Sequence, residues 1–469
     1  MTPRHARTPS GPPHCQAART VLPNNAPAAE LGRMESPPLG PASPAHSRSI
    51  TARWLHGFAT AGSSRLAWLD ALRGIAALVV VFDHSSYTFM PEFRRGLMPE
   101  FNTSRYGIMV FFLVSGYIIP ASLERRGCVR RFWVGRIFRV YPLWAAVVTV
   151  LLALDFAGVA ELRDFGGEGA VAVAVAHGTM LQELLGTPNL LLVLWTLSYE
   201  MSFYLLVVAL FTVRLHQRSA AVSVVLAGLA AVSVTAGVVL PVSALSGLVG
   251  TGPLIAIASI AMVVAICCAS AGSPLLRVFG GVLGGVLALV LVPFNGTVPL
   301  WEGLVILAVM FLGSAVYRAE NGQIAWRDAA GTAVLVVACA VGSAYGYGDG
   351  DHFTRRGWIA AFLLAVLTFG AGLWSRRLRI PRVPAGLGTI SYSVYLVHPV
   401  LLAVIDSTIG RRRQDSLVLE VAFFAVLLPL CLLTYRCVEA PGQTWGRGWA
   451  RRVRPRDERQ RHPASQAGA

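Results

Sequence analysis

The chain contains no lysine and little charge of any kind. Only 14% of its 469 residues are charged, and all 40 basic side chains are arginine, whereas soluble proteins carry about 25% charged residues. Hydrophobic residues make up 55% of the chain and come in runs of about 20, the length of helix that spans a bilayer. The shortage of charge excludes a soluble globular protein. The runs predict an all-α fold, a polytopic transmembrane helical bundle of about 10–12 helices.

The cysteines lack the spacing of a metal site or a disulfide framework. Of the seven, Cys267 and Cys268 are adjacent and Cys339 lies in an apolar run. We therefore interpret them as small buried hydrophobic residues and expect no metal. The net charge of +16 does not indicate nucleic-acid binding either. Much of the arginine falls in short loops and in the C-terminal tail, where membrane proteins place positive charge on the cytoplasmic side.

The two ends of the chain lack the apolar periodicity of the middle. Residues 1–64 are rich in Pro, Ala, Ser and Arg, without the apolar core of a signal peptide. We expect a disordered N-terminal extension there, or an over-extended start. Residues 441–469 are polar and Arg-rich and are predicted to form a disordered cytoplasmic tail. The transmembrane domain is expected to fill residues 65–440.

Apolar segments between these ends predict about twelve spans. A glycine-rich segment at 276–293 carries the weakest signal, and the region 170–186 could be a re-entrant segment. The expected spans are 66–88, 106–122, 141–160, 190–213, 219–240, 253–272, 276–293, 300–317, 329–346, 357–374, 387–409 and 417–436.

Arginine clusters orient these spans, because cytoplasmic loops are enriched in basic residues. With the N-terminus inside, the clusters after the second, fourth, eighth and tenth spans are all cytoplasmic, and Arg411–Arg413 is an exception. We expect a multi-pass protein of the cytoplasmic (inner or plasma) membrane with both termini in the cytoplasm. The clusters are Arg125, Arg126, Arg130, Arg131, Arg136 and Arg139; Arg214 and Arg218; Arg318; and Arg376, Arg377, Arg379 and Arg382. The acidic loop expected outside contains Glu161, Asp164, Glu168 and Glu183.

Three ionisable residues share one face of the first predicted span. Asp70, Arg73 and His84 are 3 and 11 residues apart, and 11 residues make three helical turns plus about 20°. Charge inside a membrane is unfavourable by about 2.5–3.5 kcal/mol per residue, so such residues usually face a protein interior and act there. His84 could accept a proton from a hydroxyl near neutral pH. The alternative is an interfacial histidine that merely caps the bundle. Asp83, about 100° round the helix, is a poor candidate for orienting the His84 ring.

A pair of arginines follows in RRFWVGRIFRVYP, residues 130–142. Arg136 and Arg139 are three residues apart and share a helix face. Such a fork at the membrane surface suits phosphate groups. On spacing alone, simple anchoring by positive charge or by lipid head groups is the better interpretation. We expect Pro142 to open the next span, because proline is tolerated in a first helical turn.

An acidic residue interrupts the apolar segment WTLSYEMSFYLL, residues 195–206. Glu200 is expected to share its helix face with Thr196, Phe203 and Tyr204. An ionised lone carboxylate is very unfavourable there, so Glu200 must be protonated or paired. It could relay protons or orient an imidazole, or it could form a structural hydrogen bond between two helices.

A histidine precedes a proline within ISYSVYLVHPV, residues 390–400. Pro399 frees a backbone carbonyl inside the span, and Ser391 and Ser393 permit close helix packing. A packing kink with a satisfied His398 is at least as good an interpretation as a catalytic role.

Taken in order, five strings resemble the acyltransferase-3 family of integral membrane O-acyltransferases. They are LDALRGIAALVVVFDH at 69–84, FFLVSGYII at 111–119, RRFWVGRIFRVYP at 130–142, WTLSYEMSFYLL at 195–206 and ISYSVYLVHP at 390–399. The resemblance covers roughly residues 66–436. It implies an enzyme that moves acyl groups, often acetyl, from cytoplasmic acyl-coenzyme A to the hydroxyl of a sugar-containing acceptor, either a cell-surface glycan or a glycosylated metabolite.

The resemblance also assigns roles to individual residues. It implies that His84 serves proton transfer or acyl transfer, that Arg136 and Arg139 hold the phosphates of the donor, and that Glu200 tunes the site. Arg73 is a third candidate for donor binding. Asp70, Tyr204 and His398 are structural or possible site residues. Thr196 stands where the family more often has serine, which keeps the hydroxyl.

The expected partners are thus acyl-coenzyme A, a hydroxyl-bearing glycan or glycoside, and the lipid bilayer, with no nucleic acid and no permanently bound cofactor. The rival interpretation is a proton-coupled transporter or flippase without acyl-transfer chemistry, since intramembrane His, Glu and Arg also serve carriers. The sequence shows no clear internal repeat of the kind that such carriers often have.

Overall fold

The computed structural model describes residues 66–160, 167–350, 354–378 and 382–452, all in one compact unit. The predicted N-terminal extension, residues 1–64, lies outside the described residues, as do Glu161 and Asp164 of the acidic loop. Every regular element that the structure describes is helical, which confirms the all-α prediction.

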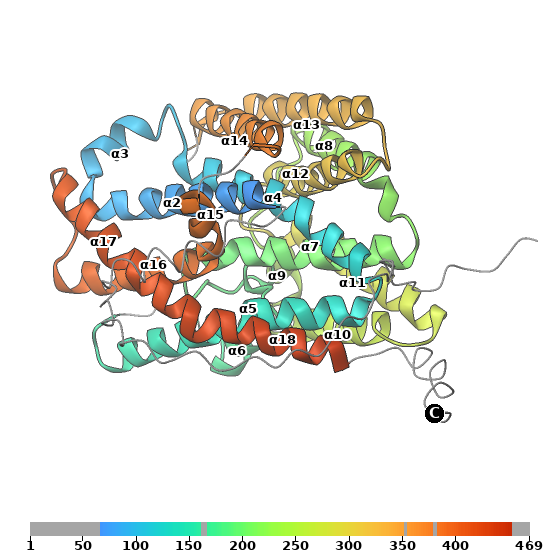
Figure 1. The fold of residues 1–469 in the computed structure, drawn as a ribbon, viewed down its shortest axis with the longest axis horizontal. Helices are drawn as coiled ribbons and strands as arrows, with labels where there is room; N and C mark the ends of the chain where they lie inside the picture. Colours follow the sequence, from blue (N-terminus) through green and yellow to red (C-terminus); the bar gives the residue numbers. More distant parts are fainter. Residues whose placement is uncertain (1–65, 161–166, 351–353, 379–381, 453–469) are drawn as a thin grey trace, which may run out of the picture. The chain divides into compact units, whose positions relative to one another are not determined.

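Twelve helices of 17 residues or more form the bundle (Figure 1). They are α2 (Ala67–Phe89), α4 (Thr103–Arg126), α5 (Val129–Phe156), α7 (Trp195–Thr212), α8 (Ser219–Thr235), α10 (Thr251–Ala269), α11 (Pro274–Asn295), α12 (Leu300–Glu320), α13 (Trp326–Tyr347), α14 (Arg355–Ser375), α16 (Ser391–Thr408) and α17 (Leu417–Thr434). Shorter helices are α3 (Pro91–Leu97), α6 (Ala170–Gly178), α9 (Ala244–Val249), α15 (Arg382–Thr389) and α18 (Ala440–Arg452). Single turns are η1 (Gln182–Leu185), η2 (Leu192–Leu194), η3 (His216–Arg218) and the π-helical η4 (Tyr435–Glu439).

Among the described residues, 10 helices are long and apolar enough to cross a membrane. An eleventh span is formed if α15 and α16, which meet at a bend of 68°, are counted together. Helix α2 matches the first predicted span but is not among these 10, and it contains Asp70, Arg73 and Asp83. The prediction of a bundle of about 10–12 helices is confirmed.

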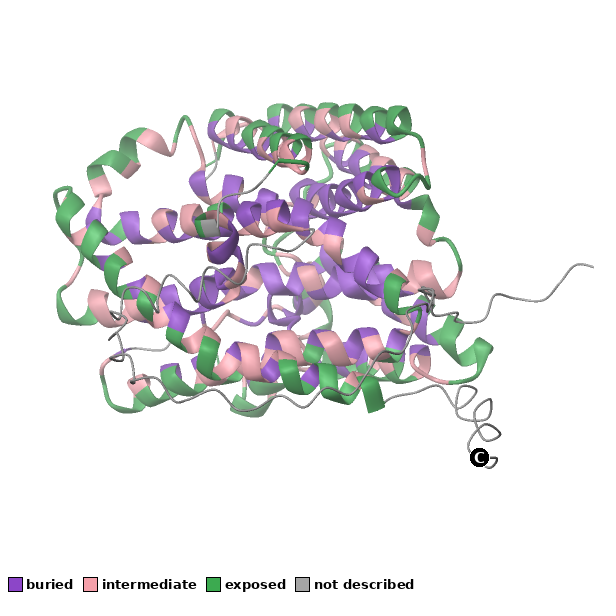
Figure 2. Ribbon diagram, in the orientation of Figure 1, coloured by how far each residue is buried: buried purple, intermediate pink, exposed green. Residues whose placement is uncertain are grey.

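Three helices form the centre of the bundle, and the others surround them. In α4, α7 and α12, 78–89% of the apolar window is buried, whereas the share in the other spanning helices is 22–39% (Figure 2). Glycines let α4 and α12 touch, because a Cβ on Gly116 would collide with the Met310 carbonyl oxygen and one on Gly313 with that of Leu113.

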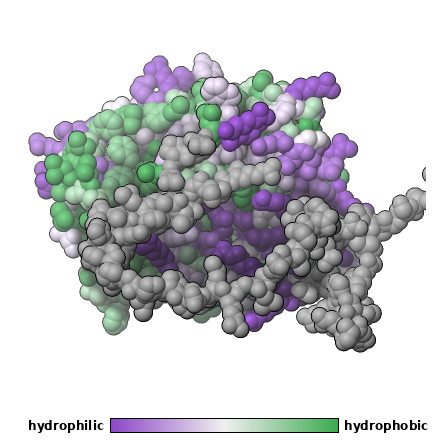
Figure 3. All heavy atoms as spheres, viewed as in Figure 1, coloured by the Kyte–Doolittle hydropathy of each residue, from purple (hydrophilic) through white to green (hydrophobic). Residues whose placement is uncertain are grey.

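The outer helices expose apolar side chains, as a lipid-facing surface requires. Ile260 of α10, Val334 of α13 and Leu367 of α14 are each more than 60% exposed. In Figure 3, hydrophobic residues cover much of the left half of the visible face, while hydrophilic residues gather toward the right.

Helix α5 begins earlier than predicted. It starts at Val129, so Arg136 and Arg139 lie within a helix instead of a loop, and Pro142 lies inside α5 instead of opening it. The reason is that Phe132, Arg136 and Val140 recur every four residues and form one buried face. This periodicity carries the helix through the arginines.

The C-terminal segment is also more ordered than predicted. Residues 440–452, expected to belong almost entirely to a disordered tail, form α18. Gly442 and Gly446 allow this helix to approach α5 closely, because a Cβ at either position would crowd Pro142 or Phe138. The remainder of the predicted tail, 453–469, lies outside the described residues.

The region 170–186 forms α6 and η1, which fold back into the bundle. Leu181, Leu184 and Leu185 have no exposed surface. Glu183, expected in an exposed acidic loop, is 4% exposed and accepts hydrogen bonds from Asn189 (2.6 Å) and Thr297. Burial raises the pKa of Glu183, and these hydrogen bonds oppose the rise.

The glycine-rich segment predicted at 276–293 forms α11. Two of its glycines face α7, where a Cβ on Gly281 would collide with the Thr212 hydroxyl and one on Gly285 would lie 2.7 Å from the Ala209 Cβ. Close packing of the glycine face against α7 thus compensates for the weak helix propensity of glycine.

Candidate active site

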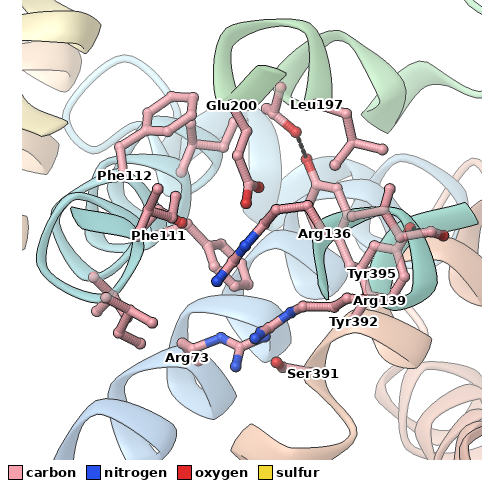
Figure 4. A pocket seen from close by; sticks show the side chains of 17 residues that line it. Arg73, Phe111, Phe112, Arg136, Arg139, Leu197, Glu200, Ser391, Tyr392 and Tyr395 are labelled. Atoms are coloured by element: carbon pink, nitrogen blue, oxygen red, sulfur yellow. Dashed lines mark hydrogen bonds between the residues drawn. The ribbon is translucent and has the colours of Figure 1, made fainter. Parts of the chain in front are cut away.

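A pocket opens between α2, α4, α5, α7 and α16 (Figure 4). It encloses about 790 Å³ of space, its open mouth included. One part of the wall is polar and the rest is apolar. The polar and aromatic lining consists of Arg73, Phe111, Phe112, Ser115, Arg136, Arg139, Thr196, Glu200, Ser391, Tyr392 and Tyr395. The apolar lining consists of Ile108, Val114, Ile118, Ile119, Val140 and Leu197.

Three arginines from two helices point into this pocket. Arg73 comes from α2, and Arg136 and Arg139 come from the buried side of α5. Arg136 is only 6% exposed, and its guanidinium carbon lies 5.4 Å from the ring centroid of Phe132 and 5.5 Å from that of Tyr204. Aromatic faces stabilise a cation without neutralising it.

Neither α5 arginine forms an ion pair within the described residues. Within the described residues, no carboxylate oxygen lies within 4.0 Å of Arg136 or Arg139, and Nε of Arg136 has no hydrogen-bond partner. Arg73 has Asp70 at 4.0 Å. Buried donors are normally satisfied, so the pocket is electrostatically complementary to an anion.

Glu200 faces the arginines from α7 and is half-buried. The hydroxyl of Tyr204, one turn further along, donates a hydrogen bond to its Oε1. Thr196 lines the same pocket, as the shared face predicts. Phe203 does not, because its ring packs against Phe311 of α12 at 5.0 Å.

Asp70 contributes to the site only indirectly. It does not line the pocket, and its backbone lies so close to Gly388 that a Cβ there would collide with the Asp70 carbonyl. The polar residues of α2 therefore lie in separate environments and not along one shared stripe. Arg73 faces the pocket, while Asp70 packs against α15.

One further carboxylate, which the sequence analysis did not single out, lies near the arginines. Glu439 is 4% exposed, lies in η4 and accepts hydrogen bonds from the Ser393 hydroxyl (2.8 Å) and Gln443 (3.1 Å). Its charge acts on those of Arg73 and Arg139. The sequence does offer a signal for Glu439, an acidic residue just after the last apolar segment. We did not single it out because the residues that follow it are predicted to form a disordered tail.

The two predicted histidines meet although 314 residues separate them. His84 Nδ1 lies 2.8 Å from His398 Nε2, and the two rings stack with centroids 5.2 Å apart. His398 is fully buried, and its Nδ1 lies 2.8 Å from the Val394 carbonyl oxygen.

These contacts fix the protons of a neutral pair. A carbonyl oxygen only accepts hydrogen bonds, so Nδ1 of His398 carries the proton and its Nε2 accepts. His84 must then donate through Nδ1–H, which leaves Nε2 of His84 with a free lone pair. His84, half-buried in α2, is thereby arranged as a proton acceptor.

The histidine pair is adjacent to the pocket but does not line it. Neither ring is among the described lining residues. Tyr395 connects the two places, because it lines the pocket and its ring centroid lies 6.2 Å from that of His398. Asp83 is engaged elsewhere, with Arg94 (2.8 Å) and Thr103 (2.5 Å), in agreement with the expectation that it does not orient His84.

Comparisons with known proteins matched the chain to a family and to a named relative. A family model described as an acyltransferase domain matches residues 66–436. A protein named Acyltransferase MdmB, from Streptomyces mycarofaciens, is 31% identical over 153 residues, which is 30% of this chain and 38% of the relative. The match thus covers well under half of that relative's length. No solved structure matched the chain.

Proposed function

The chain belongs to the acyltransferase-3 family of integral membrane O-acyltransferases, and on this premise we propose that it transfers an acyl group, acetyl in the first instance, from cytoplasmic acyl-coenzyme A to a hydroxyl of a sugar-containing acceptor. The observation that carries the proposal is the pocket in which Arg136 and Arg139, which form no ion pair within the described residues, face Glu200 next to a histidine with a free Nε2. The acceptor is a cell-surface glycan or a glycosylated metabolite.

The arginines supply the donor-binding end of the proposed site. Guanidinium groups form charge-assisted, often bidentate hydrogen bonds with phosphate, and coenzyme A carries several phosphates. Arg73, Arg136 and Arg139 hold these phosphates. The apolar wall of the pocket receives the pantetheine arm and excludes water from the thioester.

His84 supplies the chemistry at the other end. In direct transfer, its Nε2 takes the proton of the acceptor hydroxyl while the oxygen forms a bond to the thioester carbonyl carbon. The carbon–sulfur bond then breaks, and the imidazolium returns the proton to the sulfur of coenzyme A. In the alternative route, Nε2 itself attacks the thioester carbonyl carbon, and the carbon–sulfur bond breaks to release the coenzyme A thiolate. The acyl group then passes from the imidazole to the acceptor oxygen, and the proton of the acceptor hydroxyl goes to the thiolate.

Membrane orientation is part of the proposal. The connection between α4 and α5 lies in the cytoplasm, which also places the α5 arginines on the side where acyl-coenzyme A is made. The cluster Arg411–Arg413 remains an exception to this orientation.

The proposal is tested with inverted membrane vesicles from cells that make the protein, supplied with radiolabelled acetyl-coenzyme A on the exposed cytoplasmic face. Label should enter the glycan or glycoside fraction, and free coenzyme A should accumulate in parallel. His84→Ala vesicles should lose about 10²–10⁴-fold of this rate with the same amount of folded protein in the membrane. A transporter would release no coenzyme A, and equal rates in both vesicle preparations would reject the catalytic role of His84.

A further inference from the structure

We infer that the ring of Phe111 determines which acyl groups pass from the arginine pocket to the histidine pair, and that Phe111 is thus a specificity-determining residue. The inference rests on the proposed acyl transfer. It follows from two aromatic rings of the pocket wall, one of which contacts His398, the partner of the proton acceptor His84.

Phe111 and Tyr395 are neighbouring rings in the pocket wall, and Tyr395 also contacts a histidine. Both line the pocket, and their rings meet edge to face with centroids 5.6 Å apart at 70°. The centroid of the Tyr395 ring also lies 6.2 Å from that of His398. In the inferred path, an acyl group held in the pocket passes this ring pair on its way to Nε2 of His84.

The two rings differ in their freedom to move. The Tyr395 hydroxyl forms hydrogen bonds with the Thr196 hydroxyl (2.7 Å) and the Val193 carbonyl (3.1 Å), so rotation of this ring breaks both. Phe111 has no polar group and is only partly buried. It is the side chain of the pair that can turn aside.

Acyl length should therefore determine how far Phe111 has to move. An acetyl group is a single methyl beyond the carbonyl and needs the smallest displacement. Each additional methylene must find space against the ring, and one methylene commonly changes enzyme discrimination by about 10-fold or more. We expect the wild-type protein to prefer acetyl over hexanoyl donors.

The neighbouring residue provides a matched control. Phe112 has the same side chain and lines the same pocket. Its ring instead faces Tyr199 at 6.4 Å and is 3% exposed. Removing the Phe112 ring widens the pocket without opening the wall between the pocket and the histidines.

The test compares acetyl-, butyryl- and hexanoyl-coenzyme A as donors for the same inverted vesicles, with His84→Ala vesicles as background. Phe111→Ala should raise the hexanoyl-to-acetyl ratio of kcat/KM by about 10-fold or more, while Phe112→Ala should change it by less than about twofold. Phe111→Leu, which keeps an apolar side chain, should shift the ratio in the same direction and serves if the alanine variant fails to fold.

An unchanged ratio in the Phe111 variants, or an equal shift in both alanine variants, overturns the inference while acetyl transfer by the wild type continues to support the proposed function. Absence of wild-type transfer above background from all three donors rejects the proposed function, and the inference with it.

Discussion

Two arginines in this bundle are buried to nearly the same degree but lie in opposite surroundings. Arg318 of α12 is 1% exposed and is fully engaged with Glu124 (2.6 Å), Gln323 (2.7 Å) and Ser219 (2.8 Å). Arg136 is 6% exposed and has neither an ion-pair partner nor, at Nε, a hydrogen-bond partner among the described residues.

This difference separates a structural cation from a functional one. A buried guanidinium is tolerated where its partners replace the lost water, as around Arg318. Burying Arg136 without an ion-pair partner is unfavourable for folding, and an anionic ligand would compensate for the missing partner. Burial alone would not have distinguished the two.

The same comparison holds for two histidines. His177 of α6 is 1% exposed, with Nδ1 2.9 Å from the Val173 carbonyl and Nε2 accepting from the Leu190 N–H at 3.2 Å. Both of its nitrogens are occupied. His84 uses only Nδ1 for its partner, so its Nε2 is available as the proton acceptor that we propose.

The largest expected effect comes from removing Arg318, the buried arginine whose partners are all within the protein. Arg318→Ala should destabilise the protein by about 3–5 kcal/mol, because Glu124 is left as an unpaired, largely buried charge. Thermal unfolding in detergent measures the loss. A double variant with Met at 318 and Leu at 124 should recover much of it, and a single variant as stable as the wild type would show that the ion pair contributes nothing.

Removing Arg136, the buried arginine without an ion-pair partner, should affect donor binding and not reduce stability. Arg136→Gln removes one charge from the donor site, so KM for acetyl-coenzyme A should rise by about 10–100-fold, the equivalent of 1.5–3 kcal/mol for hydrogen bonds to a charged group. The melting temperature should stay level or increase. Arg130→Gln on the exposed side of α5 is the control and should change neither quantity. A destabilised Arg136→Gln protein with an unaltered KM would erase the contrast with Arg318.

A third effect concerns His398, which we expect to position the ring of His84. His398→Ala removes the acceptor for Nδ1–H of His84 and should lower kcat by about 10–100-fold with an unchanged donor KM. His398→Gln, whose side-chain oxygen can accept the same hydrogen bond, should restore much of the rate. A structural role alone would not alter the pH at which kcat is half-maximal, whereas we expect that pH to shift in the alanine variant and return in the glutamine variant.

Much of the fold could be read from the sequence, because membrane length and helical period are local properties. Each of the twelve predicted apolar segments corresponds to a helix or, at 387–409, to the bent pair α15 and α16. The errors arose where polar residues occur within a helix. The start of α5 and the whole of α18 were predicted as loop and tail because their arginines suggested solvent.

The candidate site was only partly predictable, because periodicity gives the face of a helix but not the neighbour of that face. Arg73, Arg136, Arg139 and Glu200 were singled out, and they share one pocket. The pairing of His84 with His398 depends on the packing of α2 against α16, to which no local pattern points. Arg318 was interpreted as a loop arginine. Its buried partners lie on α4 and η3–α8, far away in the sequence, so no local pattern could indicate that it is buried.

The smallest expected effect is a pH dependence of stability that arises from His177, the histidine with partners at both ring nitrogens. Burial lowers the pKa of His177 below its ordinary value of about 6.5, and protonation would also remove the acceptor for Leu190. The unfolded chain therefore takes up a proton below about pH 6.5 that the folded protein resists, so stability should fall as the pH decreases, by at most about 1.4 kcal/mol per pH unit. Melting temperatures at pH 7.5, 6.5 and 5.5 should decline more steeply for the wild type than for His177→Gln, whatever the stability of that variant at pH 7.5. Parallel slopes would mean that His177 accepts a proton in the folded protein as readily as in the unfolded chain, and that its two hydrogen bonds do not close the site.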